Sequence, residues 1–375
     1  MIPAPDPFPA PPHPVPTMRS TLVRALVALV LILPAPAAAQ RAPERLFYYT
    51  DNEDGWQSLL RNVDQVSVVA PGGYAVSEHG TVWGEVDPRV VRLGRERGVP
   101  VMPLVVNPGF DQEMLHRFLA SDEARARAVA SLVELCRRHG HWGIQVDFEN
   151  LALADRDAFT RFYRELGRAL HAAGFRLSAA VVHRPDELAG PTAYHRWLFE
   201  NWRAGYDLKA IGEIGDFVSI MSYNQHTRRT PPGPQHGMPW ITRVLEHFLE
   251  HVPARKLSLG IITGGMHWYT SQEDRIAPEM ARSYSAVVSW PRAMALVERN
   301  GARLVWDEEQ QASYARFERG GTWEWVFVED ARSFEARLGL VDRHGLRGFS
   351  VWVLGPEDPG IWEVLRRRGA PPRPR

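Results

Sequence analysis

Short apolar segments alternate with amphipathic segments along most of the chain, and this alternation constrains the fold more than any other feature. Eight segments have the length and the β-branched or aromatic content of buried strands. Parallel strands require long connections, and helices usually supply them. The predicted strands are 46–50, 65–71, 99–107, 143–150, 175–183, 216–224, 256–264 and 345–355.

Between these strands, apolar residues recur with the period of a helix at 111–139, 155–174 and 239–251. Eight strands separated by helices predict an α/β fold, a (β/α)₈ TIM barrel over residues 40–369. An open doubly wound sheet is the alternative, but its usual nucleotide-binding form has a glycine-rich turn after the first strand, which is missing here.

The long stretch between the last two strands predicts an insertion. Residues 271–332 contain two further strand-like segments, 305–317 and 323–329, so we expect a small α+β subdomain there. The proline- and arginine-rich end, residues 370–375, predicts a disordered tail.

Charge and cysteine content exclude several classes of function. The 375 residues contain 44 Lys and Arg against 44 Asp and Glu, so neither a nucleic acid nor an anionic membrane surface is an expected partner. The single cysteine, Cys136, allows no intrachain disulfide and no multi-thiolate zinc site. The histidines show no H-E-x-x-H spacing, and no G-x-S-x-G is present, so we expect no metal, no cofactor and no serine nucleophile.

The amino terminus has the layout of a secretory signal peptide. A proline-rich start is followed by Met18, a second candidate start, and by Arg19 and Arg24. The apolar run 26–33 and the small residues 37–39 follow, which predicts cleavage before Gln40. An uncleaved anchor is the alternative, but the run falls short of the about 18 residues needed to span a membrane. Residues 1–39 are therefore predicted to be removed from a secreted or periplasmic protein, which we expect to be a monomer.

The fourth predicted strand carries the chemistry. Side chains alternate between faces along a strand, so Gln145, Asp147 and Glu149 share one face, and Phe148 faces the helices. In a barrel the first face points inward, and the strand ends at the catalytic mouth. Two carboxyls about 7 Å apart along one face raise each other's pKa in a partly dry site, which suits a general acid. A pair of solvated carboxylates at a strand end is the structural alternative.

Aromatic residues stand at two further strand ends. The sixth strand places Met221 and Tyr223 on one face, and the eighth places Ser350 and Trp352 on one face. Tyr223 would supply a phenolic donor and Trp352 a flat apolar floor. Each residue alone is more commonly a core aromatic, and the combination with the carboxyl pair favours a site.

These motifs resemble those of glycoside hydrolase family 18. GIQVDFEN at 143–150 is similar to the family's Asp-Gly-x-Asp-x-Asp-x-Glu, MSYN at 221–224 to its Met-x-Tyr-Asp, and GFSVWVLGPEDPGIW at 348–362 to its eighth-strand Trp segment. The insertion and the strand-four variant are similar to the branch that includes bacterial spore-cortex hydrolases. The resemblance covers about 45–365.

The resemblance implies a mechanism in which the substrate's own acetamido oxygen is the nucleophile, an exception to the two-carboxylate scheme. Glu149 would be the general acid and base, Asp147 would hold the acetamido N–H, and Tyr223 would donate to the acetamido oxygen. Trp352 would lie beneath the reacting sugar. The resemblance also predicts substrate-binding positions, given by Gln145, Met221, Asn224, Tyr49 and Asn107.

Three departures from the family pattern affect charge. Trp142 and Gln145 replace the first two aspartates of the signature, and Asn224 replaces the aspartate after Tyr223. Gln145 can hydrogen-bond Asp147 but cannot share its charge or proton. Because Glu149 and Asp147 are both present, the sequence predicts an active enzyme.

Other residues are weaker candidates. Tyr48 and His183 lie at strand ends, and Trp268 and Trp290 would serve as sugar platforms. Three interpretations remain open: an exported glycosidase acting on N-acetylglucosamine polymers, a carbohydrate-binding barrel with little catalysis, and a cell-envelope interaction protein that docks through its insertion.

Overall fold

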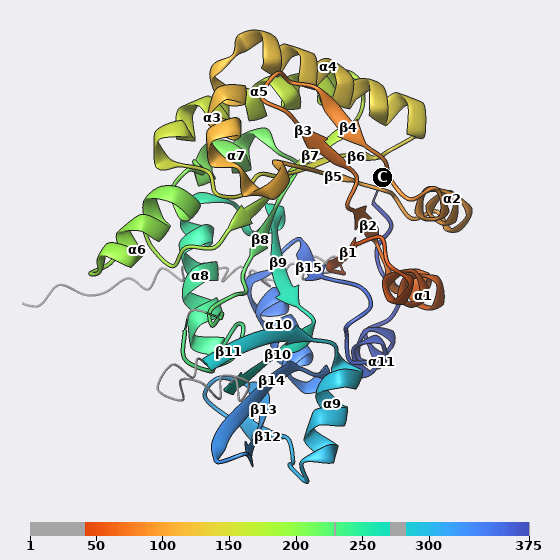
Figure 1. Ribbon diagram of the computed structural model, residues 1–375. Helices are drawn as coiled ribbons and strands as arrows, with labels where there is room; N and C mark the ends of the chain where they lie inside the picture. The colour runs from red at the N-terminus through yellow and green to blue at the C-terminus, as the bar shows by residue number, and fades with distance from the viewer. Residues whose placement is uncertain (1–41, 229, 271–282, 375) are drawn as a thin grey trace, which may run out of the picture. The chain divides into compact units, whose positions relative to one another are not determined.

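A curled parallel sheet forms the centre of the molecule (Figure 1). The computed structural model describes residues 42–228, 230–270 and 283–374. The parallel strands follow the predicted order and confirm the TIM-barrel fold. They are β1 Glu44–Tyr49, β2 Val68–Pro71, β5 Leu104–Val106, β6 Gly143–Asp147, β7 Arg176–Val182, β8 Phe217–Met221, β9 Leu257–Ile262 and β15 Gly348–Trp352.

Two contacts complete the barrel: the pairing of the first strand with the last, and a bridge from β2 to the segment before β5. The first strand, β1, pairs in parallel with both β2 and the last strand, β15. Val69 of β2 bridges to Val101, and its N–H donates to the Pro100 carbonyl at 3.1 Å. The predicted strand 99–107 is therefore interrupted: it contributes Val101 at the seam and then β5, because the prolines at 100 and 103 have no N–H to donate to a ladder. A short hairpin, β3 Tyr74–Val76 and β4 Val82–Gly84, joins the sheet beside β5.

Helices surround the sheet, and the amphipathic patterns give their positions. The predicted helix 111–139 is two helices, because Ser121 has an extended backbone and its side chain caps the second helix at the Ala124 N–H. The helices are α1 Glu53–Asn62, α2 Pro88–Arg97, α3 Gln112–Ala120, α4 Asp122–His139, α5 Arg156–Ala172, α6 Ala193–Leu198, α7 Leu208–Ile214, α8 Met238–His251, α10 Ala331–His344 and α11 Gly360–Arg367.

Alternation along the strands divides the core into two parts. On β1, Leu46 and Tyr48 belong to a small cluster inside the barrel, with Met102, Leu104 and other residues. Phe47 and Tyr49 belong to the large cluster that packs against the helices. Residues 46–49 of β1 are buried on both faces, so no polar residue among them distinguishes the inner face from the outer face.

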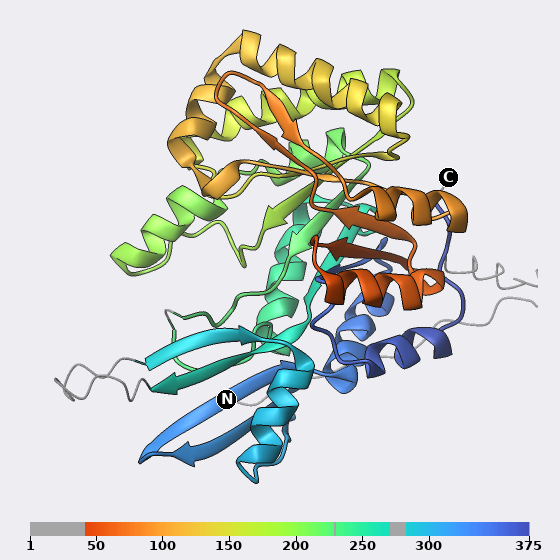
Figure 2. The ribbon, with the colours of Figure 1, turned by 45° about the vertical axis from the view of Figure 1, so that its right-hand side comes forward.

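The insertion is a five-stranded antiparallel sheet with one helix (Figure 2). It begins at Gly264, seven residues before the predicted start, and only Thr263 separates it from β9. Gly264 has φ of 76°, and a Cβ there would lie 2.7 Å from the Val288 carbonyl oxygen. Its elements are β10 Gly264–Thr270, β11 Ser283–Val288, α9 Trp290–Arg299, β12 Val305–Asp307, β13 Ala312–Arg319 and β14 Thr322–Glu329.

The carboxyl end of the chain lies against the start of the barrel strands. The Arg45 guanidinium donates to the Gly369 carbonyl at 2.8 Å. In the segment predicted as a disordered tail, Pro371 is buried and Arg373 donates to the Val66 carbonyl. Among the residues that the structure describes, no helix combines the length and apolarity needed to cross a membrane. The predicted signal segment lies outside the described residues.

Candidate active site

The fourth barrel strand delivers two carboxyl groups to the inner face of the barrel. Asp147 is the last residue of β6, and Glu149 follows two residues later. Phe148, between them, is buried in the outer core, where its ring stacks on Phe162 with centroids 5.7 Å apart. The predicted alternation is thus present, and both carboxyl side chains remain partly accessible.

Both carboxyls hold their protons more tightly than free side chains do. Burial raises the pKa of Asp147, whose Oδ1 atom is buried without a hydrogen-bond partner among the described residues. Burial also raises the pKa of Glu149, and the charge of Asp147 raises it further. A proton is therefore retained at this pair well above the pH at which an ordinary Glu loses it, as a general acid requires.

Polar side chains fill the barrel beneath Asp147. Gln145 is fully buried, and its Nε2 donates to Ser178 Oγ at 2.9 Å and to Ser219 Oγ at 3.2 Å. Its Oε1 has no partner within the described part of the chain. The Tyr48 hydroxyl interacts with the side chains of Ser219, Ser350 and Gln145, and so belongs to the same polar cluster. Gln145 is therefore a supporting residue below the carboxyls. Its amide is neutral, whereas the aspartate that the family pattern has at this position would carry charge.

Two aromatic residues complete the surroundings of the pair. Tyr223, just after β8, is 7% exposed, and burial raises its pKa, with further contributions from Tyr48, Asp147 and Glu149. Trp352 ends β15, and its ring centroid lies 5.4 Å from that of Tyr48. Tyr223 thus lies near both carboxyls, and Trp352 is linked to them through Tyr48, which also interacts with Asp147. The catalytic and substrate-binding roles of these residues stay predictions.

Asn107 has a different role from the predicted one. Its Nδ2 donates to the Glu149 carbonyl at 2.8 Å, and its Oδ1 accepts from the Glu149 N–H at 2.9 Å. The residue is 1% exposed. Both ends of the amide are used on the main chain, so Asn107 positions Glu149 and is not placed to bind substrate. Tyr206 supports the same segment from the outer core by donating to the Phe148 carbonyl at 2.6 Å.

Tyr49 does not belong to the site. Its ring is buried in the outer core, and its hydroxyl donates to Asp87 Oδ2 at 2.8 Å. Asp87 in turn pairs with Arg89 at 2.8 Å. The interior position next to it on β1 is occupied by Tyr48, so the substrate-binding prediction for Tyr49 is wrong by one residue of strand register.

The remaining predicted residues lie around the ends of β7 and β8. Met221 ends β8, and its carbonyl accepts a hydrogen bond from His183 Nδ1 at 3.1 Å. Asn224 is exposed and has φ of 65°, a left-handed conformation that asparagine tolerates. Whether these residues bind substrate stays a prediction.

An arginine that the sequence did not single out lies beside His183. Arg203 Nη2 donates to His183 Nε2 at 3.2 Å, and burial together with the Arg203 charge lowers the pKa of His183 to about 3. His183 is therefore neutral at physiological pH. Of the two proposed sugar platforms, Trp268 is 4% exposed and packs against Phe327 in the insertion, so it has little free ring surface. Trp290 opens α9 and packs against the insertion core.

Known proteins share this fold and sequence pattern. A cortical fragment-lytic enzyme of Bacillus subtilis is 31% identical over 261 residues, which cover 69% of this chain and 57% of the enzyme. A chitinase from Chromobacterium violaceum superposes with a TM-score of 0.77 at 29% identity, covering 87% of this chain and 99% of the chitinase. The spore cortex-lytic enzyme SleL of Bacillus megaterium shares the fold, with a TM-score of 0.76 at 23% identity and coverage of 89% of this chain and 75% of the enzyme.

The profile of a known family also matches the chain. It extends over residues 92–357 and so includes the strand-four carboxyls, Tyr223 and Trp352. This confirms the resemblance drawn from the strand motifs: the chain is a member of the glycosyl hydrolases family 18.

Proposed function

We propose that the protein is an exported glycosidase that hydrolyses β-linked N-acetylglucosamine polymers, either peptidoglycan or chitin-type chains. The observation that supports this most directly is the partly buried carboxyl pair Asp147 and Glu149, with Tyr223 beside it. A carboxyl that retains its proton near neutral pH can protonate a leaving oxygen, and a neighbouring carboxylate can stabilise positive charge. The relatives named above as lytic enzymes and chitinases agree with a glycan substrate.

In the proposed reaction, the protonated Glu149 gives its proton to the glycosidic oxygen while the bond to the anomeric carbon breaks. The acetamido oxygen of the same sugar bonds to that carbon, and an oxazolinium ion forms. Asp147 accepts the acetamido N–H and offsets the positive charge, and Tyr223 donates to the acetamido oxygen. The Glu149 carboxylate then takes a proton from water, which attacks the anomeric carbon and restores the acetamido group. Two displacements at one carbon retain the β configuration.

One observation favours the alternative of a carbohydrate-binding barrel with little catalysis. Gln145 is neutral and fully buried beneath Asp147, so it cannot exchange a proton with that carboxyl. Asp147 must then be deprotonated by solvent alone, against the burial that raises its pKa. Glycan binding without turnover would follow if the proton stayed on Asp147 at the working pH.

The test is the stereochemistry and substrate requirement of hydrolysis. The untagged chain is incubated with chitooligosaccharides, with their N-deacetylated counterparts and with purified peptidoglycan strands. Early-time NMR should show the β anomer first, and mass spectrometry should identify which N-acetylated glycan is cut. The deacetylated oligosaccharide, which lacks the nucleophile, should remain intact. The α anomer forming first would contradict the mechanism, and binding of an N-acetylated glycan without any cleavage would support the carbohydrate-binding barrel instead.

A further inference from the structure

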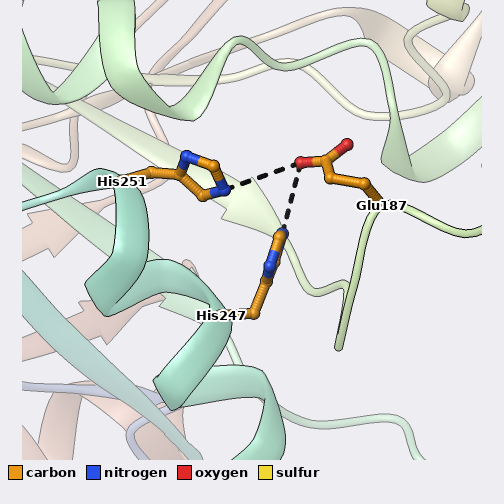
Figure 3. Close-up of side chains that lie close together, drawn as sticks. All are labelled: Glu187, His247 and His251. Carbon is orange, nitrogen blue, oxygen red and sulfur yellow. Dashed lines mark ion pairs between the residues drawn. The ribbon is translucent and has the colours of Figure 1, made fainter.

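Three side chains that commonly bind metals converge away from the carboxyl pair, between the segment after β7 and helix α8. They are Glu187, His247 and His251, and Figure 3 shows the carboxylate and both imidazole rings directed toward one another. Glu187 Oε1 lies 3.3 Å from His247 Nε2 and 3.8 Å from His251 Nε2.

Helix geometry places the two histidines on one face. His247 and His251 are four residues apart, so their side chains are neighbours on the surface of α8. The segment 247–251 has the sequence HFLEH, which is the reverse order of the H-E-x-x-H pattern of zinc enzymes. The third ligand, Glu187, is distant in sequence, so only the fold brings the three together.

The separations suit a tetrahedral ion. Zinc binds imidazole nitrogen and carboxylate oxygen at about 2.0–2.2 Å, which places the ligand atoms of a tetrahedral site about 3.4 Å apart. Two of the three separations in the structure, 3.3 and 3.8 Å, are close to this value, and all three ligand atoms lie within 4.8 Å of one another. Rotation of the exposed Glu187 side chain and of the partly exposed His251 side chain can supply the remaining adjustment, while His247 is buried and held by its neighbours.

The surroundings also suit imidazole ligation. His251 Nε2 is buried and has no hydrogen-bond partner in the described part of the chain, so a ligand there would satisfy it. His247 turns its other nitrogen, Nδ1, toward Glu250, 3.7 Å away. A carboxylate on the outer nitrogen of a ligating histidine is a common supporting contact in metal sites. Glu187 is 44% exposed, which leaves the ion a path from solvent.

The positively charged Arg184 guanidinium already contacts two members of the cluster. Arg184 Nη2 donates to Glu187 Oε1 at 2.6 Å, and Arg184 Nε donates to His247 Nε2 at 3.4 Å. An incoming ion would replace this weak second contact, while Arg184 keeps its bonds to the carbonyls of Arg203 and Tyr206. Competition with Arg184 lowers the affinity relative to a site with three free ligands.

We infer that Glu187, His247 and His251 form a binding site for a divalent transition-metal ion such as Zn²⁺. Bound there, the ion links the segment after β7 to α8. That segment also carries Arg184 and so supports Tyr206, which in turn holds the strand-four main chain at Phe148. The expected role of the metal is thus structural, because a ligand that binds only the folded state stabilises it.

The experiment uses the untagged chain after treatment with a chelator. Isothermal titration with Zn²⁺ should show one bound equivalent, and the Tm should rise with Zn²⁺ concentration. Co²⁺ should give the visible absorption of a tetrahedral nitrogen–oxygen site. Mg²⁺, which prefers octahedral oxygen ligands, should produce neither effect.

The variants His251→Ala and Glu187→Gln should each lose the Zn²⁺-dependent rise in Tm and the Co²⁺ spectrum. The control is His79→Ala, which removes a histidine 3.6 Å from Glu78 that has no third ligand beside it in the described residues. This variant should bind like the parent. Unchanged Zn²⁺ binding in both site variants would overturn the assignment, as would a parent chain that takes up no Zn²⁺.

Discussion

The side-chain amide of Asn107 binds the main chain of Glu149 at two points, accepting from its N–H at 2.9 Å and donating to its carbonyl at 2.8 Å. Asn107 lies one residue past β5, and Glu149 lies two past β6, so the contact joins the ends of adjacent strands. It fixes the backbone from which the proposed acid projects. An amide, with an acceptor oxygen and a donor nitrogen, is well suited to both contacts.

Asn107→Ala should therefore lower kcat more than it raises KM. Misplacement of a catalytic group by about 1 Å costs about 10²-fold in rate, and two unpaired main-chain groups destabilise the fold by about 1–3 kcal/mol each. Steady-state kinetics at a temperature below the lowered Tm measures the effect. Asn62→Ala, at another buried asparagine, is the control for stability alone. Equal kinetics in the two variants would contradict the positioning role.

Glu149→Gln should abolish most turnover and keep glycan binding. The amide retains size and hydrogen bonding but has no proton to deliver, so kcat should fall by at least about 10²-fold. Binding should survive because Trp352 and Tyr223 are unchanged. Calorimetric titration with a chitooligosaccharide, beside a reducing-end assay, measures both. Hydrolysis that persists at the parental rate would show that the acid lies elsewhere.

The same substitution should stabilise the protein at neutral and alkaline pH. The pKa of Glu149 is higher in the folded protein than in the unfolded chain, so the unfolded chain ionises first as the pH rises. Stability then falls between the unfolded pKa of about 4.3 and the raised folded pKa, by about 1.4 kcal/mol per unit of difference. Chemical unfolding from pH 4 to pH 9 should show Glu149→Gln and parent alike at the acid end, with the variant more stable above it. A constant difference at every pH would contradict this.

Gln145→Asp should move the acidic limb of the pH–rate profile to lower pH. A protonated carboxyl at position 145 can donate to Asp147 and favour its charged form, whereas the present amide Nε2 is used on Ser178 and Ser219. Gln145→Asn, which shortens the side chain equally without adding a carboxyl, is the matched control. If both variants shift the profile alike, the cause is packing and not proton sharing.

Export should produce a new amino terminus at Gln40. The arginines at 19 and 24, the apolar run 26–33 and the alanines at 37–39 motivate this prediction. Mass spectrometry of the protein recovered from the periplasm or the medium identifies the terminus. A chain found only in the cytosol, with residues 1–39 still attached, would refute it.

The sequence predicted the strand order and the strand-four carboxyls because their patterns are local. Asp147 and Glu149 alternate with Phe148, which labels the two faces of β6 directly. On residues 46–49 of β1 both faces are apolar, so nothing local distinguishes Tyr48 from Tyr49, and the sequence predicts the wrong tyrosine for the site.

The contacts that the sequence does not predict are those that link distant segments. The amide of Asn107 meets a main chain beside the next strand, and Glu187 meets His247 only after α8 has packed. The sequence predicts the start of the insertion seven residues too late for a related reason. The residues of β10 favour a strand in either sheet, and only the pairing of β10 with β11 and β14 assigns it to the insertion.

The pairing of β1 with β15, which joins Glu44 to Gly348, connects residues from opposite ends of the described chain and should form late in folding. Until the last strand is available, β1 and β9 both present open edges, and the barrel cannot close. Contacts between the two ends of a sequence form late, because the entropy of closing the intervening loop must be lost first. A chain threaded through a membrane from its amino end would thus remain open until its final segment emerged, and a truncation before Gly348 would leave an aggregation-prone open sheet.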